Sequence, residues 1–336
     1  MNINKLETWY HVNHRKLSFR ETNDPYLIWV SEIMLQQTQV ETVLPFFDSF
    51  ITKYPSVSFL ANAKEEVLQK DVEGLGYYRR FRNMHLAAKK IVSEYQGVFP
   101  KTHQELLDLP GIGKYTAGAI MSIAYNKPYS ALDGNVVRVL SRYLGIYDDM
   151  RQEKNKKKLD IINQALIEKA NPHIYTQGMM ELGAMICKPK NPKCELCPLN
   201  DHCYAFKHLE SDQLPYLSKL KDKKEFHFIT LILHTNHGIY MRKRTEELLK
   251  DMYEYPQFEE ESLITVLTDL EKQGVMIELI NQNHRQYKHV FTHQIWFMDV
   301  YHVIVVDGKL ENWVEMDQKE IEKSPMAIAH RKIRNK

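Results

Sequence analysis

The chain has 336 residues and a mass of 39.7 kDa. This length favours two domains, because single hydrophobic cores stop growing at about 250 to 300 residues. Hydrophobic residues make up 43% and charged residues 26% of the chain, which excludes a disordered or collagen-like protein. The sequence contains no run of about 18 apolar residues and begins without the apolar stretch of a signal peptide. We therefore expect a cytoplasmic protein without a membrane span.

Charge is unevenly divided along the chain. The formal net charge is +2, but residues 1–207 contain 27 Lys and Arg against 22 Asp and Glu, whereas residues 208–336 contain 18 against 21. The first part is thus basic and the second acidic. A basic surface suits a polyanionic partner such as nucleic acid, although so small an excess is also typical of an ordinary solvated surface.

Helical patterns dominate up to about residue 206. Apolar residues at three- and four-residue spacing, between Gly and Pro signals, predict helices at 26–35, 64–71, 82–95, 104–107, 116–125, 136–144 and 157–169. The polar stretch 208–225 predicts a linker. Beyond it, segments rich in Ile, Val, Phe and Tyr predict strands at 226–233, 238–243 and 295–306, with a helix at 263–272. We expect an all-α domain at 1–207 and an α+β domain at 226–336.

The predicted helix at 26–35 is apolar on nearly all sides and contains one carboxylate, Glu32. Such a helix is expected to be buried. Burial disfavours the ionised form, so the pKa of Glu32 should be raised, and the side chain could hold a proton to donate as a general acid. The alternative is a buried glutamate that is satisfied by a structural partner.

Two helices joined by a glycine turn are predicted at about 102–125. Thr102 and Glu105 make a capping box for the first helix, and Gly111 and Gly113 stand in the turn that follows. Glycines let the backbone turn sharply and approach a ligand closely. The N–H groups at the start of the second helix point outward, which suits a phosphate of a nucleic-acid backbone. The alternative is a plain turn between two helices.

A second carboxylate, Asp133, precedes the helix predicted at 136–144. Taken alone, it is best explained as the N-cap of that helix. The positive end of the helix dipole would also keep Asp133 ionised while burial keeps Glu32 protonated. Two carboxyls whose pKa values are pushed in opposite directions suit the cleavage of a glycosidic bond.

All the cysteines of the chain fall within 17 residues, in the spacing C-x6-C-x2-C-x5-C: Cys187, Cys194, Cys197 and Cys203. In a reducing compartment, clustered thiols favour metal ligands over disulfides. Zinc and an iron–sulfur cluster both accept four thiolates, and the spacing alone does not choose between them. Four unrelated buried cysteines are the remaining alternative.

In this order, the glycine turn, Asp133 and the cysteines resemble the endonuclease III superfamily of DNA glycosylases. The segments 31–38 (SEIMLQQT) and 74–78 (GLGYY) resemble its adenine DNA glycosylase, or MutY, branch. The resemblance extends from about Trp29 to His293. It implies a helix-hairpin-helix glycosylase domain with one 4Fe–4S cluster, bound by the four cysteines in the loop 187–203, followed by a Nudix-like domain.

Position 115 separates the two reaction types of this superfamily. Bifunctional members have a lysine there, whose amine forms a Schiff base and leads to strand cleavage. Tyr115 cannot do so, and the neighbouring Lys114 should face away from the site. The resemblance therefore implies monofunctional hydrolysis of the N-glycosidic bond of adenine, flipped out of duplex DNA in which it is mispaired with 8-oxoguanine or guanine.

The resemblance also implies roles for individual residues. Glu32 would protonate N7 of the adenine and then help to activate water, while Asp133 would stabilise the oxocarbenium-like sugar. Tyr115 and Asn135 would help to position Asp133 and the flipped nucleotide. An adenine pocket is expected from Phe19, Arg20, Leu35 and Gln177. DNA contacts are expected from Gln37 and Tyr77, as wedges in the base stack, and from Gly111, Gly113, Lys188, Lys190 and Lys193.

In the second domain, Phe291, Thr292 and His293 match the loop with which the family recognises 8-oxoguanine. Threonine stands where serine is common and keeps the hydroxyl group. No acidic Nudix-box pattern follows Pro256, so pyrophosphatase activity is not expected. The implied partner is double-stranded DNA, bound by a monomer, and the sequence does not indicate a protein partner such as a sliding clamp.

Two other functions remain open at this point. An endonuclease III-type pyrimidine glycosylase and lyase would be trapped on DNA by borohydride through a lysine. A non-catalytic DNA-binding protein with a structural zinc would lack the visible absorption of an iron–sulfur cluster.

Overall fold

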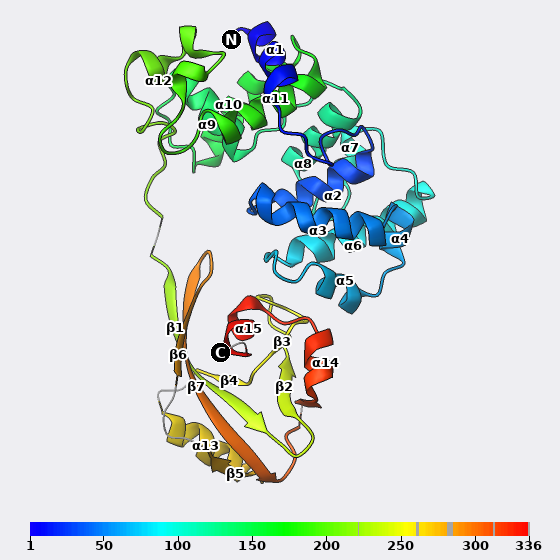
Figure 1. The fold of residues 1–336 in the computed structure, drawn as a ribbon, viewed down its shortest axis with the longest axis vertical. Coiled ribbons are helices and arrows are strands. Elements are labelled where there is room, and N and C mark those ends of the chain that lie inside the picture. The colour runs from blue at the N-terminus through cyan, green and yellow to red at the C-terminus, as the bar shows by residue number, and fades with distance from the viewer. Residues whose placement is uncertain (221, 260–261, 281–284, 312, 335–336) are drawn as a thin grey trace. The chain divides into compact units, whose positions relative to one another are not determined.

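The computed structural model describes residues 1–220, 222–259, 262–280, 285–311 and 313–334. The chain divides into two compact units, Met1–Ala63 with Arg82–Lys219, and Lys64–Phe81 with Leu220–Lys336 (Figure 1). The first is helical and the second combines strands and helices, which confirms the predicted fold class. Within the described residues, no helix is long and apolar enough to cross a membrane.

The first unit consists of helices joined by short loops. Its α-helices are α1 (Ile3–Asn13), α2 (Pro25–Leu35), α3 (Val40–Lys53), α4 (Val57–Ala61), α6 (Arg79–Tyr95, which begins in the second unit), α7 (His103–Leu107), α8 (Lys114–Ala119), α9 (Gly134–Leu144), α10 (Glu153–Ile167), α11 (Pro172–Met185) and α12 (Tyr204–Lys207). A π-helical turn, η1 (Ile120–Ala124), extends α8, and the 3-10 turns η2 (Cys194–Leu196) and η3 (Asn200–His202) lie between the cysteines. All the predicted helices are present, although the one predicted at 116–125 changes to π form at Ile120.

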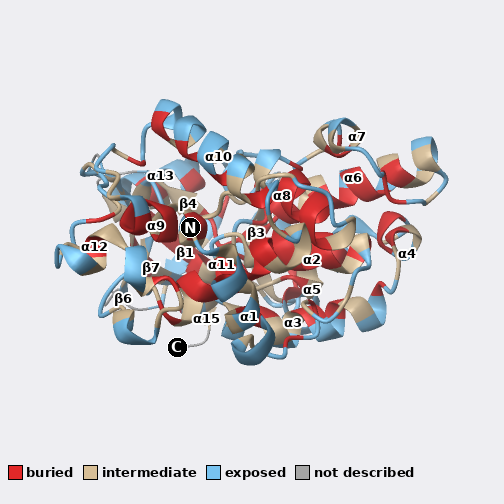
Figure 2. Cartoon of the chain, turned by 90° about the horizontal axis from the view of Figure 1, so that it is seen from above, coloured by how far each residue is buried: buried red, intermediate tan, exposed pale blue. Residues whose placement is uncertain are grey.

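Helix α2 lies in the core of the first unit. Asp24 caps it, with Oδ1 accepting a hydrogen bond from the Tyr26 N–H at 2.8 Å, and Pro25 occupies its first position. Helices α3 and α8 and the turn η1 pack around it. Consequently most of its residues are buried, as Figure 2 shows, and Trp29 is wholly inaccessible to solvent. Any charged group on α2 therefore lies in an apolar environment.

Two glycines allow unusually close contacts around α9. A Cβ on Gly118 in α8 would lie 2.0 Å from the backbone oxygen of Ser130, in the segment that leads to α9. A Cβ on Gly183 in α11 would lie 2.5 Å from the Cβ of Asn135, in the first turn of α9. Any larger residue would push these elements apart, because real Cβ atoms do not approach other atoms this closely.

The second unit is built on a mixed sheet. Its strands are β1 (Lys224–His234), β2 (Ile239–Lys243), β3 (Tyr253–Glu254), β4 (Gln257–Phe258), β5 (Met276–Leu279), β6 (Arg285–Val290), β7 (Gln294–Asp307) and β8 (Val314–Met316). The order is β3-β2-β1-β7-β5, with β4 paired to β1, β6 to β7 and β8 to β2. Strands β1 and β7 are parallel, with Lys224 opposite Gln294, and the other pairs are antiparallel.

Helices cover both faces of this sheet. Alternate residues of β1 point to opposite faces, as the period of two in a strand requires. Leu231 and Leu233 pack on one face with α13 (Leu263–Lys272). Ile232 packs on the other with α14 (Gln318–Lys323) and α15 (Ile328–Arg334). The unit also contains α5 (Glu65–Asp71).

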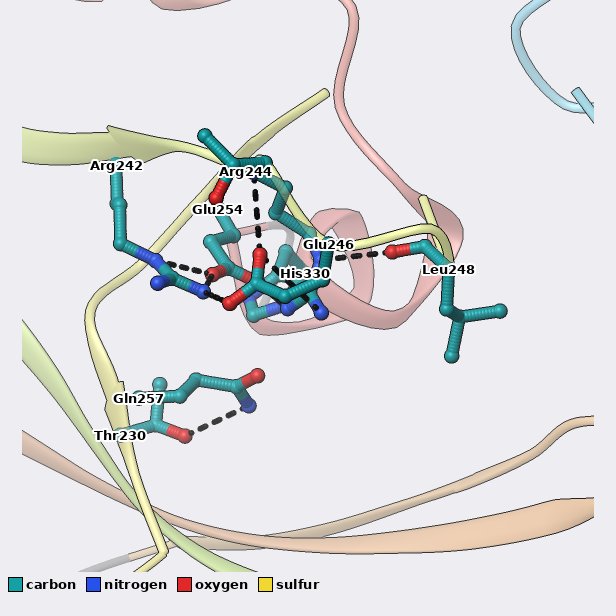
Figure 3. Close-up of polar contacts among 9 residues, drawn as sticks. Thr230, Arg242, Arg244, Glu246, Leu248, Glu254, Gln257 and His330 are labelled. Atoms are coloured by element: carbon teal, nitrogen blue, oxygen red, sulfur yellow. Dashed lines mark hydrogen bonds and ion pairs between the residues drawn. The ribbon is translucent and has the colours of Figure 1, made fainter. Parts of the chain in front are cut away.

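A buried ion cluster lies at one edge of the sheet (Figure 3). Glu254 is wholly buried and accepts hydrogen bonds from Arg242 Nε at 2.7 Å and from Arg244 Nη1. His330 Nε2 lies 3.4 Å from the same carboxylate. Burial alone would raise the pKa of Glu254, but His330 and Arg244 outweigh burial and lower it to about 2. Glu254 thus stabilises the folded unit as an anion.

The pH dependence of this stabilisation is predictable. Because the folded pKa of Glu254 is lowered, its contribution is fully present above its unfolded pKa of about 4.3 and is lost as the pH falls toward 2. The contribution is on the order of 3 kcal/mol. We expect Glu254→Gln to destabilise the second unit strongly at pH 7 and to flatten this acid limb, measured by hydrogen exchange of β1 and β7. Glu246→Gln is the matched control, since Glu246 joins the same cluster with 46% of its side chain exposed, and it should change stability by less than about 1 kcal/mol.

Candidate active site and cysteine cavity

Glu32 is the buried carboxylate that the sequence predicts on α2. It is 6% exposed and accepts a hydrogen bond from the hydroxyl of Tyr115 on α8. Burial raises its pKa to about 6, and the charge of Asp133 adds to this rise, whereas the Tyr115 hydrogen bond and the charge of Arg20 oppose it. Glu32 is therefore protonated in about half of the molecules at pH 6 and in about a tenth of them at pH 7. Lys114 is exposed.

A small pocket lies beside Glu32. It is lined by Phe19, Arg20, Ile28, Ser31, Glu32, Leu35, Ile123, Gln177 and Met180. The structure thus brings together all the residues expected for the adenine pocket, which come from the segment before α2, from α2 itself and from α11. The walls are mainly apolar, with a few polar groups, as is usual for sites that bind a planar ligand.

The sequence did not predict a role for Glu181 of α11, although it forms a buried ion pair behind the pocket. The side chain is wholly buried and lies 2.5 Å from Arg15 Nε and 3.0 Å from Arg20 Nη2. Burial opposes ionisation, but the hydrogen bond from Arg15 and the charge of Arg20 prevail and lower the pKa of Glu181. A lone glutamate in an apolar helix was the available signal, as it was for Glu32. The ion pair between Glu181 and Arg20 holds the Arg20 guanidinium at the pocket wall.

Asp133 is the N-cap of α9, and each oxygen of its carboxylate accepts a hydrogen bond. Oδ1 accepts from the Val136 N–H at 2.7 Å and Oδ2 accepts from Asn135 Nδ2 at 2.8 Å. Burial nevertheless raises the pKa of Asp133, against the lowering effect of these hydrogen bonds. The prediction that the pKa values of Asp133 and Glu32 shift in opposite directions is therefore wrong, because burial outweighs the helix start and raises both.

Two arginines connect α9 to the cysteine loop. Arg138 donates to Asn135 Oδ1 at 2.8 Å, which turns the Asn135 amide nitrogen toward Asp133, and also to the Cys187 backbone oxygen at 2.7 Å. Arg142 donates to the backbone oxygens of Lys188 and Pro189. Hydrogen bonds thus run continuously from Asp133 to the first cysteine.

The four cysteines surround one cavity, which Arg142 also lines. No disulfide joins any two of them, and burial together with the neighbouring cysteines raises the pKa of Cys197 to about 12. A cysteine binds a metal as its thiolate, so metal binding at this cavity releases protons. Among the described residues, no three His, Cys, Asp or Glu side chains are placed to hold a single metal ion. Four cysteines that line one cavity offer the four thiolates that an iron–sulfur cluster accepts.

The residues expected to contact DNA are accessible. Gln37 follows α2 with φ of +57°, and Tyr77 has φ of +48° and is 48% exposed. Residues other than glycine rarely adopt such backbone angles. Gly111 has φ of +77° and Gly113 caps α8 with open space around it. Exposed lysines in the cysteine loop complete the set: Lys188, Lys190 and Lys193.

A three-residue turn, Phe291–His293, joins β6 to β7 in the second unit. Phe291 packs on Trp296, with ring centroids 4.7 Å apart, while Thr292 and His293 are exposed. Within this unit the Thr292 hydroxyl lies 2.6 Å from the Tyr77 hydroxyl. The structure therefore presents the threonine hydroxyl next to one of the expected wedge residues.

Comparison with known proteins identifies the family. Residues 30–164 match the HhH-GPD superfamily of base excision DNA repair proteins, 187–203 the iron-sulfur binding domain of endonuclease III, and 228–336 the NUDIX domain. An adenine DNA glycosylase of Buchnera aphidicola subsp. Schizaphis graminum is 36% identical, over 85% of this chain and 82% of its own length. The chain belongs to the adenine DNA glycosylase family. A relative in Homo sapiens with the same name is 39% identical over 62% of this chain and 40% of its own length.

Solved structures resemble the helical part of the chain. A thermostable thymine-DNA glycosylase is 30% identical and superposes with a TM-score of 0.56, over 61% of this chain and 95% of that chain. An endonuclease III–DNA complex, 23% identical with a TM-score of 0.52, covers 62% of this chain and 94% of that chain and shares the helical fold.

The cofactor of this adenine DNA glycosylase family member is one 4Fe–4S cluster, with the cysteines at 187–203 as its ligands. The second unit contains the predicted Nudix fold. The absence of pyrophosphatase activity, expected because no acidic Nudix-box pattern follows Pro256, stays a prediction.

Proposed function

We propose that this protein is a monofunctional adenine DNA glycosylase that hydrolyses the N-glycosidic bond of adenine opposite 8-oxoguanine or guanine, and so begins base excision repair. The observation that carries this proposal is the buried Glu32, with its pKa raised to about 6, at a largely apolar pocket. Tyr115 donates to it at the position where a lysine would be needed for strand cleavage.

In the proposed reaction the adenine is flipped out of the duplex into the pocket. Glu32 gives its proton to N7, so that the base leaves as a neutral species. The hydroxyl of Tyr115 orients the carboxyl group of Glu32. Asp133 then faces the developing positive charge of the sugar, held in place by the Val136 N–H and by Asn135. After the base has left, the ionised Glu32 accepts a proton from the attacking water.

The DNA-binding assignments are supported by exposure and charge. Gln37 and Tyr77 would fill the stack from which the base has left. Gly111 and Gly113 would bring backbone N–H groups of the hairpin to one phosphate. Lys188, Lys190 and Lys193 would contact others, and each should contribute to the salt dependence of binding.

The remaining assignments complete the proposal. We assign the glycosylase domain to 1–207, the linker to 208–225 and the domain that recognises 8-oxoguanine, through Phe291, Thr292 and His293, to 226–336. The protein would act as a monomer on duplex DNA in the cytoplasm.

A glycosylase assay on defined duplexes tests this function. Adenine should be released opposite 8-oxoguanine and more slowly opposite guanine, oxidised pyrimidines should stay in place, and strand breaks should appear only after alkali. Trapping of the protein on DNA by borohydride through a lysine, with efficient strand cleavage, would establish the lyase function instead.

The contact to 8-oxoguanine gives a separate prediction. Thr292→Ala should reduce the preference for 8-oxoguanine over guanine opposite adenine by about 3- to 10-fold, since one neutral hydrogen bond is lost. Excision opposite guanine should not change. Thr292→Ser keeps the hydroxyl and serves as the control, because its preference should match that of the unaltered protein. Equal preferences in all three proteins would contradict the assignment of the turn.

A further inference from the structure

The pocket beside Glu32 contains a polar side chain whose orientation depends on a histidine behind it. Gln177 is 2% exposed and lines the pocket together with Glu32 and Ile123. Its amide lies 2.9 Å from Nε2 of His173, one turn earlier on α11. Within the part of the chain that the structure describes, His173 is not among the residues that line the pocket.

The position of the proton on His173 follows from a second contact. Its Nδ1 lies 2.7 Å from the backbone oxygen of Ile123. Ile123 belongs to the π-helical turn η1, near the helix end where carbonyl groups lack partners within the helix. A carbonyl oxygen only accepts hydrogen bonds, so Nδ1 carries the proton, and Nε2 of the neutral ring is an acceptor.

This tautomer decides how the Gln177 amide is turned. An acceptor at Nε2 requires a donor opposite it, so the amide nitrogen of Gln177 faces His173. The assignment follows from the chemistry of the three partners, which is how amide orientations are established in general. Among the described residues, none donates a hydrogen bond to Gln177 Oε1. The polar atom that Gln177 offers to the pocket is therefore its oxygen.

An oxygen at this place distinguishes purines by the group at C6. Adenine has an amino group there, which donates, whereas hypoxanthine has a carbonyl, which only accepts. A free glutamine amide would suit either base, since a half-turn exchanges its oxygen and nitrogen. An amide that cannot turn rejects the carbonyl, because two acceptors would then face each other in a dry pocket.

We propose that His173 is a positioning residue that fixes the Gln177 amide, so that its oxygen accepts a hydrogen bond from the exocyclic amino group of adenine and excludes a purine with a carbonyl at C6. The proposal rests on the proposed function and adds the origin of its selectivity among purines. His173 touches Gln177 and Ile123 and acts on the base only through Gln177.

The test compares excision of adenine and of hypoxanthine, each opposite 8-oxoguanine, by the full-length protein under single-turnover conditions. The unaltered protein should favour adenine. His173→Phe keeps the ring shape but removes the acceptor, and the ratio of the two rates should fall about tenfold, as expected for loss of roughly 1.4 kcal/mol of discrimination. Adding Gln177→Glu to His173→Phe should restore the ratio, because a carboxylate accepts in either orientation.

Several outcomes would overturn the proposal. An unchanged ratio in His173→Phe, or no recovery in the double variant, would show that His173 does not set the amide. Gln177→Leu is an independent variant that should lose the same selectivity, and an unchanged ratio there would refute the contact even if His173→Phe failed to fold. Visible absorption by the cluster reports folding of each variant. If the unaltered protein released no adenine, the proposed function itself would fail, which is a distinct result.

Discussion

Glu32→Gln should bind duplex DNA containing the mispair as the unaltered protein does but lose base removal. A general acid typically contributes about 10²- to 10⁴-fold to the rate, and glutamine cannot supply the proton. Glutamine is nearly isosteric and can still accept the Tyr115 hydrogen bond, so the pocket should keep its shape. Single-turnover excision measured alongside DNA binding separates the two effects. Appreciable residual turnover would refute the role of Glu32 as the acid.

The same variant should be more stable than the unaltered protein at neutral and alkaline pH. The folded pKa of Glu32 is raised to about 6, so the stability associated with its protonated form is present at low pH and is lost as the pH rises through 6. Removing the charge should therefore raise the free energy of unfolding by roughly 2 kcal/mol at pH 8 and change little at pH 4.

A matched control is Glu94→Gln on α6, where the carboxylate is 56% exposed. It should leave the excision rate unchanged and alter stability by less than about 0.5 kcal/mol. If Glu32→Gln loses activity and gains stability while Glu94→Gln does neither, Glu32 serves catalysis at a cost in stability. A destabilised Glu32→Gln protein would support the structural alternative.

Asp133→Asn should lower the excision rate by at least about 10²-fold, because it removes the negative charge that would face the oxocarbenium-like sugar in the proposed reaction. Asparagine caps helices as well as aspartate does, so α9 should keep its start. The variant therefore separates the charge of Asp133 from its capping role. Because Asn135 loses its acceptor at position 133, we expect the first unit to lose about 1 kcal/mol of stability at most, while single-turnover excision is lost.

The controls for this result are two alanine substitutions at caps. Asp133→Ala should lose both the charge and the cap, and Asn171→Ala should lose only the cap of α11, where Asn171 accepts from the Ile174 N–H at 3.2 Å. Each should cost about 1 kcal/mol of stability, but only the first should abolish excision. If Asp133→Asn lowered stability but left the excision rate unchanged, helix capping would be the only role of Asp133.

Local sequence signals predicted the positions of the chemical groups well. The helix around Glu32 is apolar on all sides, and this predicted its burial and the raised pKa. The capping position of Asp133 followed from its place before an amphipathic helix, and the hairpin followed from its capping box and glycines. The clustered cysteines do line one cavity. In each case the signal lies within one segment of no more than about 17 residues.

Features that depend on distant segments were not predictable. Helix α11 is buried along most of its length, so it shows no amphipathic period, although Asn171-Pro172 is a usable start signal. The role of its Glu181 depends on ion pairs with Arg15 and Arg20, which lie far away in the sequence. Strand β6 is largely polar and exists because it pairs with β7. The predicted direction of the Asp133 pKa shift was wrong because the residues that bury Asp133 come from helices distant in the sequence, and the residues around position 133 do not reveal them.

The close approach of Gly118 to Ser130 fixes the position of the hairpin relative to the segment that carries Asp133. Tyr115, which holds the carboxyl group of Glu32, lies one turn before Gly118, and Asp133 lies three residues after Ser130. Gly118 contacts the backbone of Ser130 without an intervening side chain. No rotamer change at this contact can therefore adjust the spacing between Glu32 and Asp133. In the proposed reaction, the hairpin expected to bind a phosphate thus also sets the distance across which the sugar would fit, so a tilt of the hairpin on DNA would change the geometry at the bond to be cleaved.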